Sequence, residues 1–313
     1  MNFTQITDVR QLNRLRILNL IAKSEHTNRA QISRELGFNK VSTGEIVDIL
    51  IKEGLVEETG ADNNTSGRPS ITLTLNKERY FVIAIDIGLR NIRIALINLK
   101  GELLRFERFP TPPSPSVEEA MALIIKHITT YKARLSKEQT IKGIAISIGA
   151  DVEPSTGTII EHRDWKWRNT PLSYTIEKYT HLPTIVENNV VAMIKGEKWF
   201  NEEAHNKRMF YVNWGEHISG AYSGPGRKIS PEALFGHMVV SETNRCSCGG
   251  IGCLETVASG IVLSKYASKN NSVKALTEEA IEDPRLQRIL YESVTYMAKA
   301  LINTDSPAFS PRV

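Results

Sequence analysis

Three short helical patterns come first along the chain. Residues 12–23 repeat apolar side chains at a spacing that places them near one helical face, namely Leu12, Leu15, Leu18 and Ala22. A second helix is predicted between Asn28, whose side chain can cap its first turn, and the stop signal Gly37. After a very short turn, a third helix is predicted between Asn39 and Gly54.

Two β-prone runs follow, at residues 55–59 and 70–75, and flank a polar tip that contains glycine, which predicts a β-hairpin. Three short helices and a hairpin predict a winged helix-turn-helix, whose third helix fits the major groove of DNA. The residues expected to contact DNA are Asn39, Lys40, Ser42, Thr43 and, in the wing, Arg68. A small helical protein-interaction domain is the alternative, and Glu45 favours it slightly because a carboxylate repels phosphate.

From residue 80 onward, apolar strands alternate with amphipathic helices. Strands are predicted at residues 81–87, 92–99, 141–150, 184–186 and 209–214, and helices at about 117–134, 189–200 and 284–302. This alternation indicates the α/β class. Glu187, Asn188 and Asn189 stand where a strand gives way to a helix, and α/β folds build ligand sites at such carboxyl ends of strands.

Composition and charge limit the class of protein. The chain has 313 residues, of which 41% are hydrophobic and 24% are charged, as in ordinary globular proteins. No apolar run is long enough to cross a bilayer and the N-terminus lacks a signal-peptide core, so a cytoplasmic protein without a membrane partner is expected. The net charge is only +4, yet residues 1–40 carry seven Lys/Arg against three Asp/Glu, and residues 41–75 carry two against six. The N-terminal module is therefore expected to be electrically polarised.

All three cysteines lie in the segment CSCGGIGCLE, residues 246–255. Structural disulfides are rare in the reducing cytoplasm, so clustered thiols there indicate a metal site. Cys246, Cys248 and Cys253 supply three ligands, and His237 in FGHMVV, at the expected entry to a strand, is the natural fourth. Four nitrogen and sulfur ligands are typical of a structural Zn²⁺ and leave no open position for catalysis. Free core cysteines and a redox pair are the alternatives.

These segments together resemble the ROK family, which groups sugar-responsive transcriptional repressors with sugar kinases. The likeness covers nearly the whole chain and rests on SGRPSITLTLN, DIGLRNIR, DWKWRNTPL, VENNVVAMIKGE, FGHMVV and CSCGGIGCLE. It implies a two-lobed, actin-like ATPase (ribonuclease H-like) domain behind the winged helix of the repressor branch. It also implies a sugar pocket with Asn188, His237 and Glu255, whose amide, imidazole and carboxylate suit sugar hydroxyls. His237 would bind zinc through one ring nitrogen and a hydroxyl through the other.

Several positions depart from the kinases of this family. Asn189 stands where the kinases carry the aspartate that takes a proton from the sugar, and an amide cannot accept that proton. Residues 89–91 (LRN) replace a Gly-Gly-Thr turn near the phosphates, Leu234 replaces a sugar-binding glutamate, and residues 149–150 (GA) replace Pro-Gly. These departures predict that the chain is not an enzyme. They also leave open a regulator that no longer responds to sugar.

The resemblance sets the expected domain organisation. The winged helix is expected at residues 1–76, the first lobe at 77–199, and the second lobe, with the zinc site, at 200–313. Because the family continues beyond its long helix into further strands, the second lobe is expected to be incomplete. The expected function is a sugar-responsive repressor that binds double-stranded operator DNA as a homodimer or higher homo-oligomer and takes a sugar or sugar-phosphate effector. A sugar kinase with an accessory DNA-binding domain is the enzyme alternative.

Overall fold

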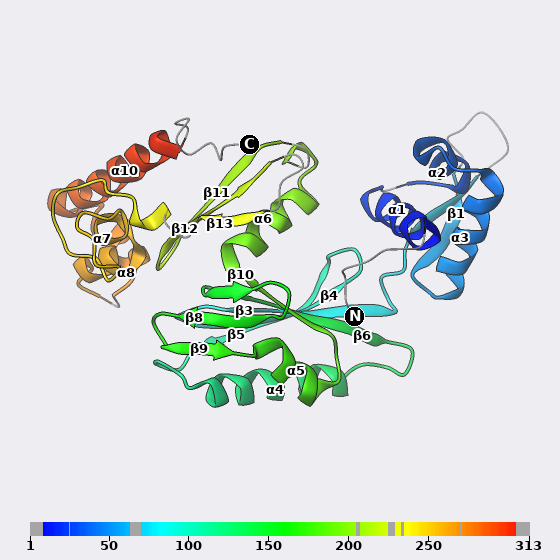
Figure 1. Ribbon diagram of the computed structural model, residues 1–313, viewed down its shortest axis with the longest axis horizontal. Coiled ribbons are helices and arrows are strands. Elements are labelled where there is room, and N and C mark those ends of the chain that lie inside the picture. The colour runs from blue at the N-terminus through cyan, green and yellow to red at the C-terminus, as the bar shows by residue number, and fades with distance from the viewer. Residues whose placement is uncertain are drawn as a thin grey trace. The chain divides into compact units, whose positions relative to one another are not determined.

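The structure is a computed structural model that describes residues 9–24, 26–62, 70–204, 207–224, 229–232, 235–269 and 271–304. The chain divides into two compact units, Met1–Glu187 and Asn188–Val313, and Figure 1 labels their helices and strands. Both units combine helices with strands, as the predicted α/β class requires. The domain boundaries expected at residues 76/77 and 199/200 stay predictions. No helix in the described part of the chain is long and apolar enough to span a membrane.

The first unit begins with a module of three helices and a hairpin, which we call the winged-helix module (residues 9–75). Its elements are α1 (Val9–Lys23), α2 (Arg29–Leu36), α3 (Lys40–Lys52), β1 (Val56–Asp62) and β2 (Ser70–Leu75). β1 and β2 are antiparallel, and Thr27 forms an isolated bridge to Leu73. This order of elements is the one the sequence predicts. Arg68 lies outside the described residues.

Local signals fix the ends of the module's helices. The side chain of Asn28 accepts a hydrogen bond from the backbone N–H of Gln31 at 2.9 Å, and that of Asn39 caps α3 in the same way. Gly37 ends α2 with φ at 66°, a left-handed conformation that glycine adopts without steric penalty. The two asparagine caps and the glycine stop are therefore present, whereas the side chain of Gln31, expected to reach back to Asn28 in a capping box, instead donates to Glu35.

The winged-helix module has its own hydrophobic core. Side chains from all five of its elements are buried there, namely Ile17, Ile21, Ile32, Ile46, Val47, Leu50, Val56, Leu73 and Leu75. The predicted apolar face of α1 is wrong in part, because Leu12 and Leu15 are 44% and 42% exposed. The helix instead turns Ile17 and Ile21, four residues apart, toward the core.

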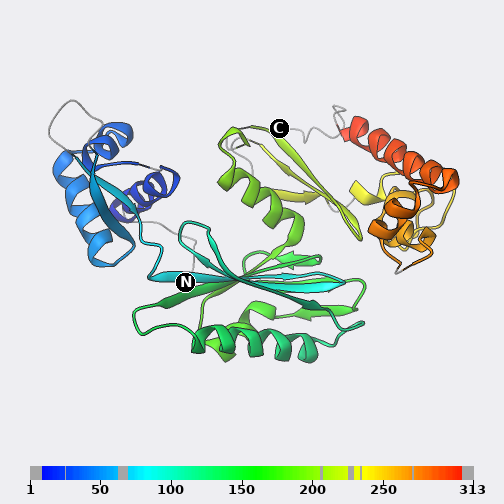
Figure 2. The ribbon, with the colours of Figure 1, turned by 180° about the vertical axis from the view of Figure 1, so that it is seen from behind.

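A five-stranded sheet follows in the first unit. Its strands are β3 (Tyr80–Ile87), β4 (Asn91–Asn98), β5 (Leu103–Pro110), β6 (Thr140–Ile148) and β10 (Thr184–Asn188), in the order β10-β6-β3-β4-β5. β3 runs parallel to β6 and antiparallel to β4. The helices α4 (Val117–Ala133) and α5 (Leu172–Thr180) pack against it, and both views show them on the same side (Figures 1 and 2). A smaller sheet of β7 (Asp151–Glu153), β8 (Thr158–His162) and β9 (Trp167–Thr170) was not predicted.

The second unit is built on an antiparallel meander of β11 (Met209–Trp214), β12 (Ile218–Ser223) and β13 (Ser230–Glu232). The helix α6 (Asn189–Phe200) packs with Ala221 of β12, whereas Ile218 of the same strand joins a core with the long helix α10 (Pro284–Thr304). Short elements complete the unit: η1 (Glu202–Ala204), η2 (Phe235–His237), α7 (Glu255–Ala258), α8 (Gly260–Leu263), η3 (Ser264–Tyr266) and α9 (Val273–Glu279).

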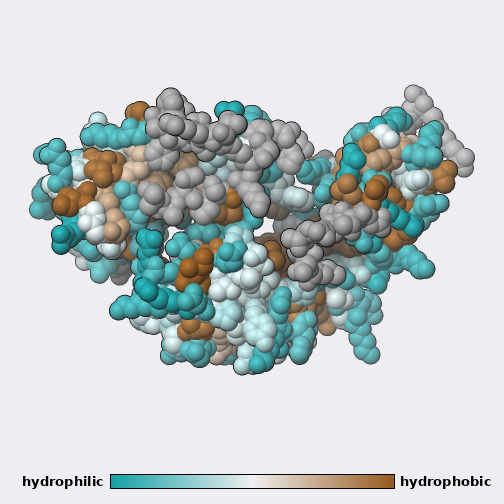
Figure 3. All heavy atoms as spheres, viewed as in Figure 1, coloured by the Kyte–Doolittle hydropathy of each residue, from teal (hydrophilic) through white to brown (hydrophobic). Residues whose placement is uncertain are grey.

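The predicted strands and helices agree closely with these bounds. The helix at 189–200 and the strand at 209–214 coincide with α6 and β11, and the helices at about 117–134 and 284–302 match α4 and α10 within two residues. On the face seen in Figure 3, hydrophilic and hydrophobic side chains are interspersed among the described residues. The recurring pattern of apolar spacing is therefore enough to locate the main elements.

Candidate functional site

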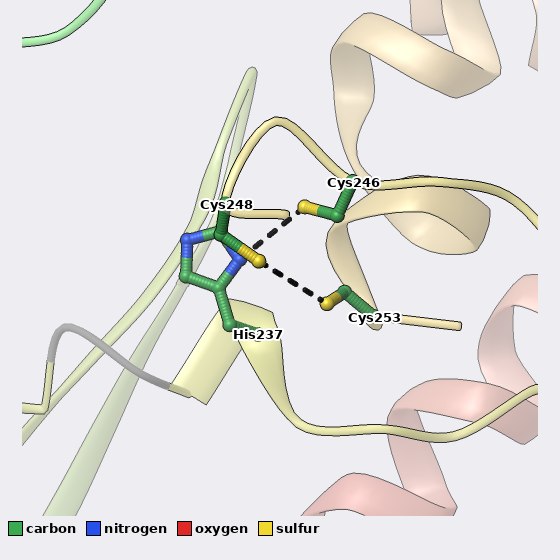
Figure 4. Close-up of side chains that lie close together, drawn as sticks. All are labelled: His237, Cys246, Cys248 and Cys253. Atoms are coloured by element: carbon green, nitrogen blue, oxygen red, sulfur yellow. Dashed lines mark hydrogen bonds between the residues drawn. The ribbon is translucent and has the colours of Figure 1, made fainter. Parts of the chain in front are cut away.

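Four side chains that can bind a metal converge in the second unit. His237, at the end of η2, faces the thiols of Cys246, Cys248 and Cys253 (Figure 4). All four ligand atoms lie within 4.8 Å of one another. The structure thus brings together the four residues that the sequence predicted as ligands. The segment FGHMVV led us to expect His237 at the start of a strand, but His237 instead ends a 3₁₀ turn.

The distances inside the cluster fit a tetrahedral ion. His237 Nδ1 lies 3.4 Å from the Sγ of Cys246, and the Sγ atoms of Cys248 and Cys253 are 3.7 Å apart. Zinc–sulfur bonds of about 2.3 Å at tetrahedral angles separate two sulfurs by about 3.8 Å. An imidazole with three thiolates is also the donor set that soft and borderline divalent ions prefer. The cluster can therefore hold a metal with little rearrangement, and Nδ1 would be the ring nitrogen that binds it.

Glycines let the loop around the cluster close. Gly252 has φ at 76°, and a Cβ there would lie 1.8 Å from the carbonyl oxygen of Ser241. Gly250 sits against two of the thiols, since a Cβ on it would be 3.4 Å from the Sγ of Cys253 and 3.5 Å from that of Cys248. The backbone N–H of Cys246 donates to the carbonyl oxygen of Gly250 at 2.8 Å. The turn is thus held by backbone bonds that larger residues would displace.

The thiols of the cluster differ in acidity. Burial raises the pKa of the Cys253 thiol to about 12, whereas a hydrogen bond from the backbone N–H of Gly250 lowers the pKa of the Cys248 thiol. Metal binding removes the protons of such thiols because the thiolate is the ligand. A cation at the centre of the cluster would therefore compensate for the burial of Cys253.

Glu255 lies next to the metal cluster and begins α7. Its Oε2 accepts a hydrogen bond from the backbone N–H of Ile218 at 2.9 Å, and its Oε1 lies 2.7 Å from Nδ1 of His217. A Cβ on Gly236, the neighbour of His237, would lie 3.2 Å from Oε2 and 2.3 Å from the carbonyl oxygen of Ile218. The carboxylate of Glu255 therefore lies against the backbone beside His237. His217 was missed in the sequence, where only its place after an apolar strand marks it.

Asn188 stands at the N-terminus of α6. Its Oδ1 accepts hydrogen bonds from the backbone N–H groups of Val190 and Val191, at 3.0 and 3.4 Å. The side chain of Asn189 likewise accepts from Val190. These contacts make Asn188 the N-cap of α6, which packs with Ala221 in one core of the second unit. His237 and Glu255 lie beside a different core, the one around Ile218. Its membership of a common sugar pocket therefore stays a prediction.

All the predicted DNA-contacting residues except Arg68 of the wing lie at the start of α3. Asn39, Lys40 and Ser42 are exposed there. Thr43 is fully buried, and its hydroxyl donates to the carbonyl oxygen of Asn39 at 2.9 Å. The prediction that Thr43 contacts a base is therefore wrong, because its side chain is buried and its hydroxyl bonds to the first turn of α3. Leu234, like Arg68, lies outside the described residues.

Asp86, near the end of β3, is held in an ion pair with Arg93 of β4. Asp86 Oδ2 pairs with the guanidinium of Arg93, and its Oδ1 accepts a hydrogen bond from the hydroxyl of Ser147 at 2.8 Å. The hydroxyl of Thr111 donates to the carbonyl oxygen of Gly88 at 2.6 Å and fixes the turn. Both oxygens of Asp86 thus have protein partners. Arg93 was not singled out in the sequence, although its position opposite Asp86 in the predicted hairpin could have indicated the ion pair.

Comparisons with known proteins agree with this architecture. The xylose repressor of Caldicellulosiruptor bescii is 29% identical over 284 residues, which cover 88% of this chain and 69% of that protein. The crystal structure of a ROK family transcriptional regulator, a homologue of the E. coli MLC protein, superposes with a TM-score of 0.78 at 24% identity and covers 94% of this chain and 79% of that one.

A ROK family glucokinase from Streptomyces griseus, in complex with glucose and AMPPNP, has a TM-score of 0.55 at 23% identity and covers 70% of this chain and 76% of that one. Both solved structures show the two-lobed fold that the sequence predicts. The model of the ROK family matches residues 82–312, well over half of the chain. This chain belongs to the ROK family.

Proposed function

We propose that this protein is a sugar-responsive transcriptional repressor. The proposal rests on one observation: a single chain contains both a winged-helix module and a ROK domain. The third helix of that module starts with exposed polar residues. The name of the xylose repressor to which the chain is similar supports this function. A repressor of this kind works in the cytoplasm, as a homodimer on a two-fold symmetric operator.

In this proposal the start of α3 enters the major groove. Asn39, Lys40 and Ser42 would contact bases or phosphates there, and Arg68 in the wing would reach a phosphate or the minor groove. The side-chain oxygen of Asn39 caps α3, so its amide nitrogen is the group directed to DNA. Thr43 has no direct role.

We further propose that the cluster of His237, Cys246, Cys248 and Cys253 holds a structural Zn²⁺. When bound, the ion would cross-link η2 to the cysteine loop and so fix the imidazole. Because Nδ1 faces the thiols, Nε2 would be the nitrogen that meets a sugar hydroxyl.

The sugar pocket would combine Asn188, His237 and Glu255. The carboxylate of Glu255 already accepts a backbone N–H and pairs with His217, yet each of its oxygens has a further lone pair for a hydroxyl. His217 would share this carboxylate with the ligand. A sugar or a sugar phosphate is the proposed effector class.

A sugar kinase is the second candidate, and the likeness to a solved glucokinase favours it. Two observations oppose it. Asn189 cannot act as a base, and both oxygens of Asp86 are engaged by Arg93 and Ser147. A phosphotransfer assay with ATP and a panel of sugars tests this candidate, and turnover would reject our assignment of a non-enzyme. A regulator without sugar response is the third reading, which a calorimetric sugar screen without any hit would support.

Selection of binding sites from random duplex DNA tests the main proposal. The full-length protein is expected to enrich a two-fold symmetric site, and the selection is repeated with a library of sugars. Lys40→Ala serves as the variant, and Lys178→Ala, which changes an exposed lysine on α5 outside the winged-helix module, serves as the matched control. No enriched site, or equal enrichment by the Lys40 variant, would overturn the DNA-binding assignment. Metal analysis of the purified protein, with no zinc found, would overturn the metal assignment.

A further inference from the structure

The C-terminus of α3 is closed by a glycine turn that meets the first strand of the sheet domain. Gly54 has φ at 73°, and the backbone N–H of Leu55 donates to the carbonyl oxygen of Leu50 at 3.0 Å, as in a Schellman turn. The last carbonyl groups of any helix lack partners inside the helix. One of them, the carbonyl oxygen of Glu53, accepts a hydrogen bond of 2.6 Å from the hydroxyl of Tyr80. The C-terminus of α3, the helix proposed to enter the major groove, is thus tied to the first residue of β3.

Two cations hold the ring of Tyr80 in this position. The guanidinium carbon of Arg79 lies 5.4 Å from the ring centroid and the ammonium nitrogen of Lys142, on β6, lies 4.1 Å from it. A Cβ on Gly54 would lie 2.5 Å from atoms of the Arg79 side chain, so that side chain also covers the end of α3. Positive charge next to a helix C-terminus is favourable, and cations are attracted to the face of an aromatic ring. Tyr80 itself is only 8% exposed.

The connection between the module and the sheet is itself hydrogen-bonded. The backbone N–H of Asn76 donates to the carbonyl oxygen of Leu55 at 2.9 Å. The side chain of Asn76 accepts from the backbone N–H groups of Glu78 and Arg79, at 3.0 and 3.1 Å. The segment between β2 and β3 is therefore a fixed turn, unlike a flexible linker.

A second contact joins the module to the β4–β5 turn. Leu99, at that turn, packs against the core of the winged-helix module. The turn is stiffened by Asn98, which is 4% exposed and whose Oδ1 accepts from the backbone N–H groups of Lys100 and Glu102, both at 3.0 Å. Tyr80, on β3, and Leu99, at the β4–β5 turn, thus fasten the module at two separate points.

We infer that Tyr80 is a positioning residue that makes the winged-helix module and the five-stranded sheet move as one rigid body. In the proposed function, on which the DNA part of this inference rests, the orientation of each recognition helix is then set by the sheet domain. The spacing of two half-sites on DNA would follow from how two sheet domains are held, and an effector that shifts them would act on DNA binding directly.

Backbone ¹⁵N relaxation of the full-length protein tests the rigid junction without DNA. Residues 26–62 and 80–187 are expected to have the same rotational correlation time in the wild-type protein. In Tyr80→Phe, and in Leu99→Ala as a second variant, residues 26–62 are expected to have a shorter correlation time. Tyr179→Phe, an exposed tyrosine on α5, is the matched control and should leave both values unchanged. A shorter value for the module in the wild-type protein, or no change in either variant, would overturn the inference.

Binding to the DNA sites selected by the wild-type protein separates positioning from simple stability. Tyr80→Phe is expected to bind a single half-site with unchanged affinity. The wild-type protein should prefer the selected spacing over one that is two base pairs longer, and in Tyr80→Phe this preference should fall about fivefold, which is the effect of one hydrogen bond. Unchanged spacing preference, or an equal loss at the single half-site, would contradict the positioning role. If the wild-type protein selects no DNA, the proposed function fails, and the relaxation experiment still decides the junction.

Discussion

Replacing Gly252 by alanine should weaken metal binding far more than the same change at Gly249. Both glycines have positive φ, at 76° and 92°, and an L-residue there costs about 1–2 kcal/mol. The two sites differ in space. A Cβ at Gly249 meets nothing within 4 Å, whereas one at Gly252 would lie 1.8 Å from the carbonyl oxygen of Ser241. Gly252→Ala must therefore push apart two backbone segments, and Gly249→Ala need not.

The carbonyl oxygen of Gly252 accepts hydrogen bonds from the backbone N–H groups of Val240 and Ser241, at 2.9 and 3.2 Å. Moving the segments apart strains or breaks both, which adds about 2 kcal/mol to the cost of the conformation. If that cost falls on the metal-bound form, zinc affinity drops by roughly 30-fold relative to Gly249→Ala. Gly249→Ala is the matched control, because it carries the same φ penalty in the same loop.

The assay is competition for zinc between each full-length variant and an indicator chelator of known affinity. Equal zinc affinity of the two variants would refute the steric argument. If the wild-type protein takes up no zinc, the metal assignment itself fails. Thermal unfolding of the second unit then still compares the two variants, and Gly252→Ala is expected to unfold at the lower temperature.

Three further predictions follow from other contacts. Asn189→Asp should not restore phosphotransfer from ATP to any sugar, because Asp86 stays paired with Arg93; turnover in a coupled assay would contradict this. The guanidinium of Arg29 bridges Asp48 and a carboxylate of β1 at a partly exposed site, so Arg29→Met should lower the free energy of unfolding of the winged-helix module by about 1 kcal/mol. Arg29→Lys should recover part of this loss, and urea unfolding measures both. Removing metal with a chelator should expose the cysteine loop to protease while the first unit stays resistant, whereas uniform cleavage would argue against a local role for the metal.

Sequence patterns located the winged-helix module well because its signals are local. Asn28 and Asn39 cap helices, Gly37 ends one, and these roles depend on neighbours within a few residues. The face of α1 was harder to assign. Leucines at 12 and 15 continue the apolar pattern, but burial depends on where α3 and β2 lie, and those elements meet Ile17 and Ile21 instead.

The clustering of His237 with the three cysteines was also predictable, since the cysteines lie within eight residues and the histidine is nine residues before them. Contacts that join segments distant in the sequence could not be predicted in this way. His217 reaches Glu255 across 38 residues, and Arg93 reaches Asp86 only because a hairpin folds them together. The burial of Thr43 was missed for a similar reason, because a polar residue at the start of a helix looks like a surface position until the core behind it is known.

The local character of the winged-helix module has a consequence for how the chain is made. The fully buried side chains of its core and the caps of its helices all come from residues 9–75, so these contacts are available before the sheet domain leaves the ribosome. Domains with contacts close in sequence fold quickly, and the N-terminal ones fold first during synthesis. Tyr80 and Leu99 emerge next and meet a surface that has already formed. The winged-helix module is then expected to serve as a template on which the first strands of the following domain assemble.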